Sequence, residues 1–174
     1  MFMKALLGLT GSRIVVSAFL IVAATVACSK DRSVKFEQVY AGANAPADEI
    51  GPQYFSDAAT LNNSWVKTVL SEGSYKTLLS RINFERQVLL ASPGGPRTSF
   101  SGDITITRVY QWVSGDSAIM NVSIQVGVLP DGCKNNLISV PFALAIIEKP
   151  PAFEPGRSFD VGNFSATCPQ YDKK

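Results

Sequence analysis

Three cysteines carry the most reactive side chains of this 174-residue chain, and histidine is absent. The cysteines are Cys28, Cys133 and Cys168. An odd number of cysteines in a secreted protein indicates that one thiol has a separate use. The absence of histidine removes Ser-His-Asp and Cys-His catalysis, the usual general base near neutral pH and most zinc sites. The chemistry that this sequence offers is therefore the chemistry of its thiols.

Cys28 ends an apolar segment near the N-terminus. Lys4 and Arg13 precede the apolar run, which extends without charge over 14 residues from Ile14 to Ala27. This run is short for a membrane span of about 20 residues and has the length of a signal-peptide core, roughly 7–15 residues. The end "TVAC" (25–28) resembles the lipobox of bacterial lipoproteins, with threonine where leucine is usual. The resemblance implies that residues 1–27 are a cleaved signal peptide and that the Cys28 sulfur carries a lipid. The alternatives are an ordinary secretion signal and an uncleaved anchor.

Lipidation of Cys28 would leave Cys133 and Cys168 as a pair outside the cytoplasm, where disulfides form and persist. A bridge between them would close a loop of about 35 residues, worth on the order of 3–4 kcal/mol in the chain-entropy model. The alternative is two free thiols. Ser29 after the lipidated cysteine is compatible with sorting to an outer membrane. We therefore expect a lipid-anchored envelope protein at the outer membrane or cell surface, with the periplasm or secretion as alternatives.

Composition and charge exclude several classes of partner. Without residues 1–27 the chain has 147 residues, enough for one domain, with 14 basic and 14 acidic residues. A neutral chain without a basic cluster is not expected to bind nucleic acid or an anionic membrane surface. Membrane contact is therefore expected only through the lipid on Cys28. The acidic residues near the predicted strand ends lack calcium-loop or catalytic-pair spacing. We expect no enzyme, no cofactor and no metal.

Hydrophobic periodicity predicts a mainly β domain. Tyr75, Leu78, Leu79 and Ile82 follow the i, i+3, i+4, i+7 spacing of an amphipathic helix over 74–82. Residues 118–128 alternate apolar and polar side chains, as in a half-buried antiparallel strand. Further strands are expected at 34–40, 65–70, 87–92, 104–113, 137–147 and 157–168. The predicted fold is an antiparallel sheet or small β-sandwich with one packed helix, and an α+β fold is the alternative.

Domain boundaries follow from these elements. After the signal peptide, residues 28–60 are expected to be a tether and loosely ordered lead-in. They include most of the irregular segment 41–64, which is rich in Gly, Pro, Asn and Ala. Residues 61–168 are expected to form a single domain, and 169–174 a tail.

Two segments, 82–110 and 122–150, resemble the PrcB-type domain family, named for a spirochaete lipoprotein that stabilises a surface protease complex. The similarity rests on strand and turn patterns: Phe84 to Leu90, Ile104 to Val109, the turn at 129–132 and the pair Pro141-Phe142. The loop at 93–102 lies between the first two strands, and its residues Arg97 to Gly102 depart from the family pattern. The resemblance implies a non-enzymatic β domain that binds a partner protein and stabilises a surface protease or other envelope complex.

The glycine-rich loop "SPGGPRTSFSG" (92–102) is the candidate partner-binding segment, because loops on a rigid β scaffold often carry binding. Arg97, Thr98, Phe100 and the turn Asp131-Gly132 are the candidate contacts. The alternative for the loop is a plain connection between strands. For the whole protein, the alternative function is a protease inhibitor that uses the loops at 93–102 and 130–136. Four aromatic residues are candidates either for a surface patch or for the core: Trp65, Phe100, Tyr110 and Trp112.

Overall fold

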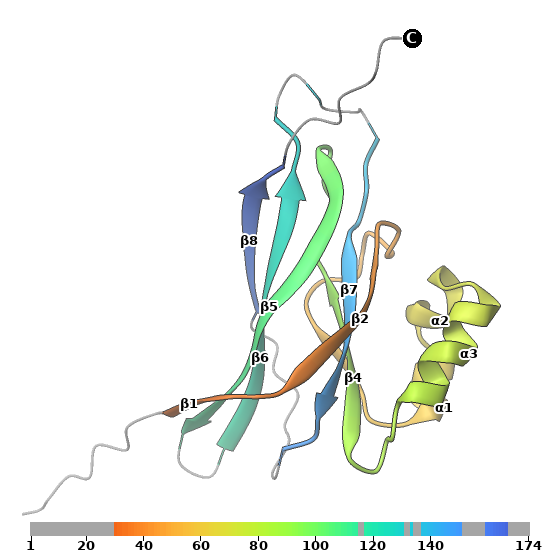
Figure 1. Cartoon of the computed structure of the whole chain (residues 1–174), viewed down its shortest axis with the longest axis vertical. Helices are drawn as coiled ribbons and strands as arrows, with labels where there is room; N and C mark the ends of the chain where they lie inside the picture. The colour runs from red at the N-terminus through yellow and green to blue at the C-terminus, as the bar shows by residue number, and fades with distance from the viewer. Residues whose placement is uncertain (1–29, 115–116, 131–132, 134–136, 151–158, 167–174) are drawn as a thin grey trace, which may run out of the picture.

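The computed structural model describes residues 30–114, 117–130, 133, 137–150 and 159–166. Within these residues, two four-stranded sheets pack face to face (Figure 1). The first sheet has the order β1-β5-β6-β8: β1 (Lys30–Ser33), β5 (Phe100–Ser114), β6 (Ser117–Val128) and β8 (Phe159–Ser165). The second sheet has the order β2-β7-β4-β3: β2 (Phe36–Gly42), β7 (Phe142–Glu148), β4 (Gln87–Pro93) and β3 (Gln53–Phe55). The predicted mainly β fold is confirmed.

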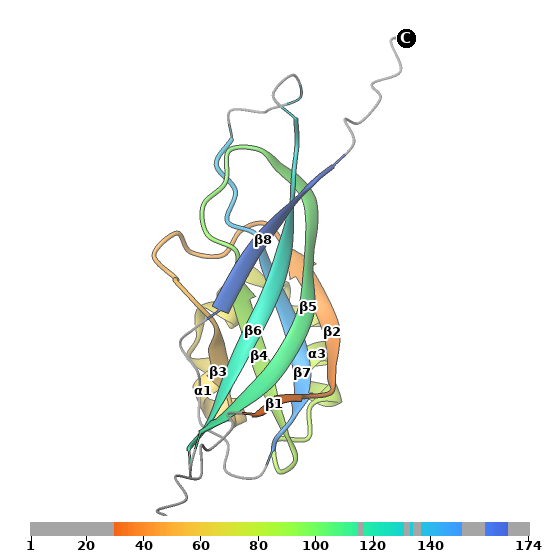
Figure 2. The ribbon, with the colours of Figure 1, turned by 90° about the vertical axis from the view of Figure 1, so that its left-hand side faces the viewer.

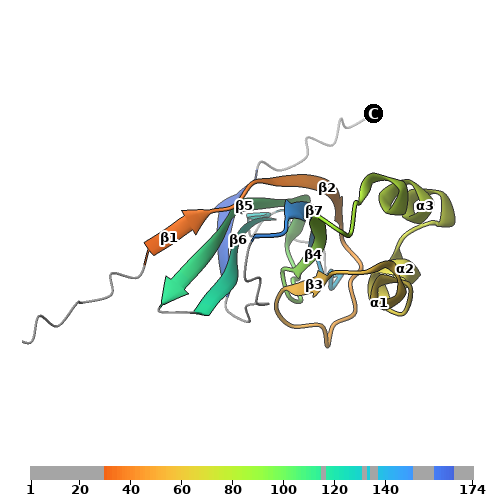
Figure 3. The same cartoon turned by 90° about the horizontal axis from the view of Figure 1, so that it is seen from below.

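Three helices cover the face of the second sheet that points away from the first sheet (Figure 3). They are α1 (Ala58–Asn62), α2 (Trp65–Val69) and α3 (Glu72–Arg81). The described chain therefore has three layers, with the second sheet in the middle. One apolar core lies between the helices and the second sheet, and the other lies between the two sheets.

Helix α3 confirms the helix predicted over 74–82. The Ser71 hydroxyl caps its start by accepting a hydrogen bond from the Ser74 N–H at 3.2 Å. Tyr75 and Leu78 are buried against the second sheet. A helix of 10 residues is marginal in water, so this packing is what stabilises it.

The strand predicted at 65–70 is wrong, because these residues form α2. Trp65 and Val66 are consecutive and both buried, whereas consecutive side chains of a strand point to opposite faces. Only the helical backbone brings both into the core between the helices and the sheet. There the Trp65 ring meets the Phe142 ring edge-on, with centroids 5.2 Å apart.

Strand β7 is the centre of the second sheet, as the apolar character of both faces of 137–147 indicated. Phe142 and Leu144 face the helices, and Ala143 and Ala145 face the first sheet. The strand begins directly after Pro141, which lacks the N–H that a ladder needs. Leu137 and Ile138, which were expected to continue the strand, precede it and are exposed.

The alternation predicted for 118–128 is also confirmed. Met120, Val122, Ile124 and Val126 of β6 are buried between the sheets. In Figure 2, β8, β6 and β5 of the first sheet lie in front of the second sheet. Strand β8 runs parallel to β6, and it is the exception among the described strand pairs, which are otherwise antiparallel.

Among the described residues, strand pairing is already present at Lys30, before residue 61, where the domain was predicted to start. Residues expected to be a tether form β1, which pairs with β5 from Lys30↔Val113 to Ser33↔Tyr110. The irregular segment 41–64 contains β3 and α1. These short elements are held by partners far away in the sequence, and no local pattern shows such partners.

Gln38 of β2 connects the two sheets. Its Nε2 donates to the Ile104 carbonyl at 3.1 Å, and its Oε1 accepts from the Ile106 N–H at 2.7 Å. A β-bulge between Gln38 and Tyr40 resets the alternation of β2. Tyr40 therefore reaches the helix side of the second sheet, where its ring stacks on Phe142.

Candidate functional site

The segment 94–99 lies at one end of the sandwich and is fixed by backbone hydrogen bonds on both sides. Arg97 and Ser139 exchange two bonds, with N···O distances of 2.7 and 2.8 Å. On the other side the Leu129 N–H donates to the Ser99 carbonyl at 2.7 Å. The predicted loop is therefore a short extended segment between two others, and its backbone is held in place.

Glycines allow this segment to leave β4. Gly95 has φ +73°, in the left-handed region that side chains disfavour. Gly94 donates its N–H to the Pro141 carbonyl at 2.7 Å, and a Cβ there would lie 3.0 Å from a methyl group of Val126. The glycines of this loop thus serve its conformation and its close approach to the sheet.

Arg97 and Thr98 of this segment lie beside two exposed apolar residues. Because Arg97 pairs with Ser139 in an antiparallel bridge, Thr98 is opposite Ile138. Ile138 and Leu137 are 70% and 71% exposed. Thr98 is exposed, and Arg97 is half-buried with its Nε donating to the Gly94 carbonyl at 3.2 Å. We call these four residues, Arg97, Thr98, Leu137 and Ile138, the loop-end surface.

Phe100 does not belong to this surface, and its prediction as a contact is corrected. Its side chain is 8% exposed and lies in the core between the sheets. Phe100 starts β5 opposite Val128, and the ring packs inward with the apolar side of that strand. A partner has no access to it in this structure.

The remaining predicted site residues lie largely outside the described residues. Asp131 and Gly132 do so, as do Cys28 and Cys168. Cys133 is half-buried, and its N–H donates to the Pro130 carbonyl at 2.9 Å. The Cys133–Cys168 disulfide therefore stays a prediction.

Strand pairing brings the ends of β6 and β8 together. Strands β6 and β8 are parallel and end together, with Val128 beside Ser165. The Ala166 N–H continues the pairing by donating to the Val128 carbonyl at 3.0 Å. The ends of β6 and β8 therefore lie side by side; along the sequence, Cys133 follows the first and Cys168 follows the second.

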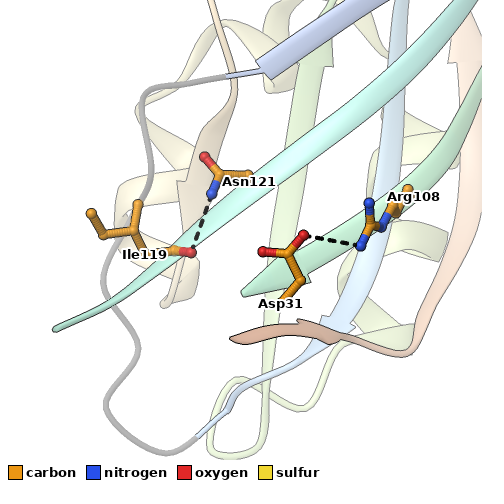
Figure 4. A network of polar contacts seen from close by, with 4 residues as sticks. All are labelled: Asp31, Arg108, Ile119 and Asn121. Atoms are coloured by element: carbon orange, nitrogen blue, oxygen red, sulfur yellow. Dashed lines mark hydrogen bonds and ion pairs between the residues drawn. The ribbon is translucent and has the colours of Figure 1, made fainter. Parts of the chain in front are cut away.

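The four aromatic candidates do not form one patch. Trp65 and Phe100 are buried in different cores. Trp112, 41% exposed, and the half-buried Tyr110 lie on β5. Near them, Asp31 and Arg108 from neighbouring strands form an ion pair at 3.4 Å, and the Asn121 amide donates to the Ile119 carbonyl (Figure 4). The Arg108 guanidinium lies 4.3 Å from the centre of the Tyr110 ring.

A groove of about 410 Å³ separates β2 from α3. Val39, Tyr40 and Leu78 supply apolar walls, and Ser74 and Thr77 supply hydroxyls. Arg81 lines one part of the groove and pairs with Glu37 at 2.6 Å. The groove shares no residue with the loop-end surface.

Shifted pKa values mark structural positions. Burial raises the pKa of Tyr54, whose hydroxyl donates to the Met120 carbonyl at 3.3 Å, and burial also raises the pKa of Tyr75. Hydrogen bonds from the backbone and hydroxyl of Thr60 lower the pKa of Asp57, which caps α1.

Among the described residues there is no cluster of three acidic or thiol side chains suited to a metal ion. None of the described helices has the length and apolar character of a membrane span.

Comparison with known proteins gives no relative: no family model matches the chain, and no curated protein or solved structure matches it significantly. The PrcB-type resemblance stays a prediction that rests on the strand and turn patterns. The sequence singled out Arg97 and Thr98 as candidate contacts but not their neighbours Leu137 and Ile138, because it placed those two in a strand. Pro141 was the available signal, since a strand that starts at Phe142 leaves both of them outside.

Proposed function

We propose that the chain is a lipid-anchored, non-enzymatic protein of the cell envelope that binds a partner protein through its loop-end surface. Following the PrcB-type resemblance, the proposed partner is a surface protease complex that it stabilises. The exposed pair Leu137 and Ile138, beside a backbone fixed by hydrogen bonds, is the observation that carries the proposal.

Exposed apolar side chains on a rigid backbone favour binding for two reasons. Full burial of a leucine or isoleucine contributes about 1.5–3 kcal/mol. Since both are about 70% exposed, covering the pair would contribute roughly 2–4 kcal/mol. The backbone of Arg97 and Ser139 is already ordered, so binding would cost little conformational entropy there.

The position of the predicted anchor supports this use of the surface. Strand β1 begins at Lys30, two residues after Cys28, and pairs with the C-terminal end of β5. The loop-end surface lies at the other end of β5, beyond Phe100 (Figure 1). The 15 residues of β5 span about 45 Å at ~3.3 Å per residue. A lipid on Cys28 would therefore leave the loop-end surface facing away from the membrane.

The proposed Cys133–Cys168 disulfide would join the segments that follow β6 and β8 at this same end. It would restrict the chain around the loop-end surface and so help to keep the surface in one conformation.

The mass of the mature protein, measured before and after reduction, tests both covalent proposals, the lipid anchor and the disulfide. Added acyl mass with loss of residues 1–27 supports the anchor, and a gain of two hydrogens on reduction supports the bridge.

Capture of the partner, followed by an activity measurement, separates the proposed stabiliser from the alternative inhibitor. The protein is captured from detergent-solubilised native membranes, and the co-purified proteins are identified by mass spectrometry. The proteolytic activity of the captured complex is then followed over time, with and without added protein. A stabiliser preserves activity, whereas an inhibitor that uses the loops at 93–102 and 130–136 lowers it at once. Capture of no stoichiometric partner would contradict both.

A further inference from the structure

The four edge strands of the two sheets differ in how they are protected against pairing with another chain. Strand β3 has three residues, and β1 has four, of which three are charged. Strand β2 contains the bulge between Gln38 and Tyr40. Short length, charge and bulges are the common means by which proteins prevent edge strands from pairing.

Strand β8 is longer than β1 and β3, has no bulge in its pairing with β6, and carries a single charged residue, Asp160. It pairs with β6 in a regular register over seven residues, from Val122↔Phe159 to Val128↔Ser165. It contains no proline, lysine or arginine. No described strand pairs with its other edge, and it lies at the margin of the sheet in Figure 1. Asp160, Gly162 and Asn163 are exposed.

Within the described residues, the backbone of β8 presents hydrogen-bonding groups that have no partner at this edge. The Ala166 N–H points toward β6, where it donates to the Val128 carbonyl. Because backbone groups alternate sides along a strand, those of Gly162 and Phe164 also point toward β6. The N–H and C=O groups of Val161 and Asn163 therefore point outward.

We propose that β8 pairs antiparallel with β8 of a second copy of this chain, about a two-fold axis at Gly162. Gly162 is the midpoint of Phe159–Ser165, so this register pairs all seven residues. It places Val161 opposite Asn163 of the second copy, which brings outward-facing backbone groups together. The first sheet would continue across the axis into its symmetry mate. This pairing uses no residue of the loop-end surface. The two-fold axis inverts the second copy, so the two predicted anchors would lie at opposite ends of the dimer and could not both enter one membrane face. The dimer is therefore proposed for the chain in detergent solution.

Side-chain size and charge favour a second copy as the occupant. The two Gly162 residues would meet as a pair without mutual hydrogen bonds, the type in which side chains approach most closely, and glycine avoids crowding there. Asp160 is the one charged residue of β8. In this register the two Asp160 residues lie four positions apart, about 14 Å along the strands. That separation exceeds the Debye length of about 8 Å at physiological salt, so their repulsion is screened.

Cysteine cross-linking of the full-length chain in detergent tests the register. Opposed Cα atoms in such a pair lie about 4.5 Å apart, within the range that a disulfide spans. Gly162→Cys should therefore give a disulfide-linked dimer on mild oxidation, with the bond mapped to residue 162 of both copies. A Cβ at Gly162 makes only ordinary contact, 3.5 Å from the Gln125 side chain, so the fold should tolerate it. Gly73→Cys is the matched control, because a Cβ there meets nothing within 4 Å. The unmodified chain, run alongside, accounts for its own cysteines. No link at residue 162, or equal linking at residue 73, would overturn the proposal.

The mass of the complex provides a second test without new cysteines. Light scattering should give the native chain twice the protein mass of Gly162→Lys, because that variant places like charges opposite each other. Gly73→Lys should keep the native mass. A native monomer, or a dimer that Gly162→Lys leaves intact, would refute pairing through β8.

Discussion

Replacing Phe100 with alanine should destabilise the protein strongly, whereas replacing Ile138 with alanine should not. Both residues lie at the same end of the sandwich, but Phe100 is 8% exposed and Ile138 is 70% exposed. Truncation of a buried phenylalanine to alanine typically costs 3–5 kcal/mol through lost burial and the cavity left behind. Because Phe100 starts its strand near the end of the core, we expect a value near the lower limit, about 3 kcal/mol. A surface substitution such as Ile138→Ala should stay within about 0.5 kcal/mol.

Urea unfolding, followed by tryptophan fluorescence, measures this difference. With a slope of roughly 2 kcal/mol per molar urea, Phe100→Ala should lower the midpoint by about 1.5 M. Ile138→Ala should shift it by about 0.25 M or less. Equal midpoints for the two variants would refute the assignment of Phe100 to the core. They would also restore Phe100 as a candidate for partner contact.

The remaining predictions concern the backbone and the electrostatics of the fold. Gly95→Ala should cost about 1–2 kcal/mol, because Gly95 has φ +73°. Gly73→Ala within α3 should instead stabilise by about 0.5–1 kcal/mol, and the same urea assay checks both signs. Gln38→Leu should reduce stability by about 1–3 kcal/mol, because it leaves backbone groups of β5 unpaired. Amide exchange at Ile106 should then accelerate. An unchanged exchange rate would argue against Gln38 as a connection between the sheets. The pKa of Asp57 is lower in the folded state than the ordinary aspartate value of about 3.9. The Asp57 carboxylate therefore stabilises the fold fully above that ordinary pKa. This stabilisation is lost as the pH falls through the lowered folded-state pKa. Asp57→Asn should therefore reduce stability at neutral pH and make less difference in strong acid, and a difference that persists unchanged in acid would contradict the cap.

The parts of the fold that were predictable are those with a local pattern. The spacing of Tyr75 and Leu78 identified α3, and the alternation from Met120 to Val126 identified the buried side of β6. Both patterns record one buried face of one element. The apolar character of both faces of β7 likewise indicated its central position.

The parts that were missed depend on partners far away in the sequence. Strand β1 is defined by its pairing with the end of β5 and has no apolar pattern of its own. The run Trp65 and Val66 suits a strand by composition, and only the core beneath it selects a helix. The parallel direction of β8 relative to β6 follows from the path of the chain and not from its residues.

The candidate site divides along the same line. Glycine content and residue type indicated Arg97 and Thr98, and the structure places both at an exposed end. Phe100 has the residue type of an interface anchor but is buried, because it continues the inward face of β5. Leu137 and Ile138 look like core residues by hydropathy, yet they precede the strand and stay exposed.

Parallel capture from detergent-solubilised native membranes tests the central claim most directly. The tagged native chain is compared with a Leu137→Ser, Ile138→Ser double variant and with Ile50→Ser. Ile50 is 86% exposed and lies between β2 and β3, so Ile50→Ser controls for the loss of an exposed isoleucine. Our account predicts that the native chain and Ile50→Ser retain the same stoichiometric partner, while the double variant loses it and keeps its unfolding midpoint. Equal retention by all three proteins would contradict binding through the loop-end surface.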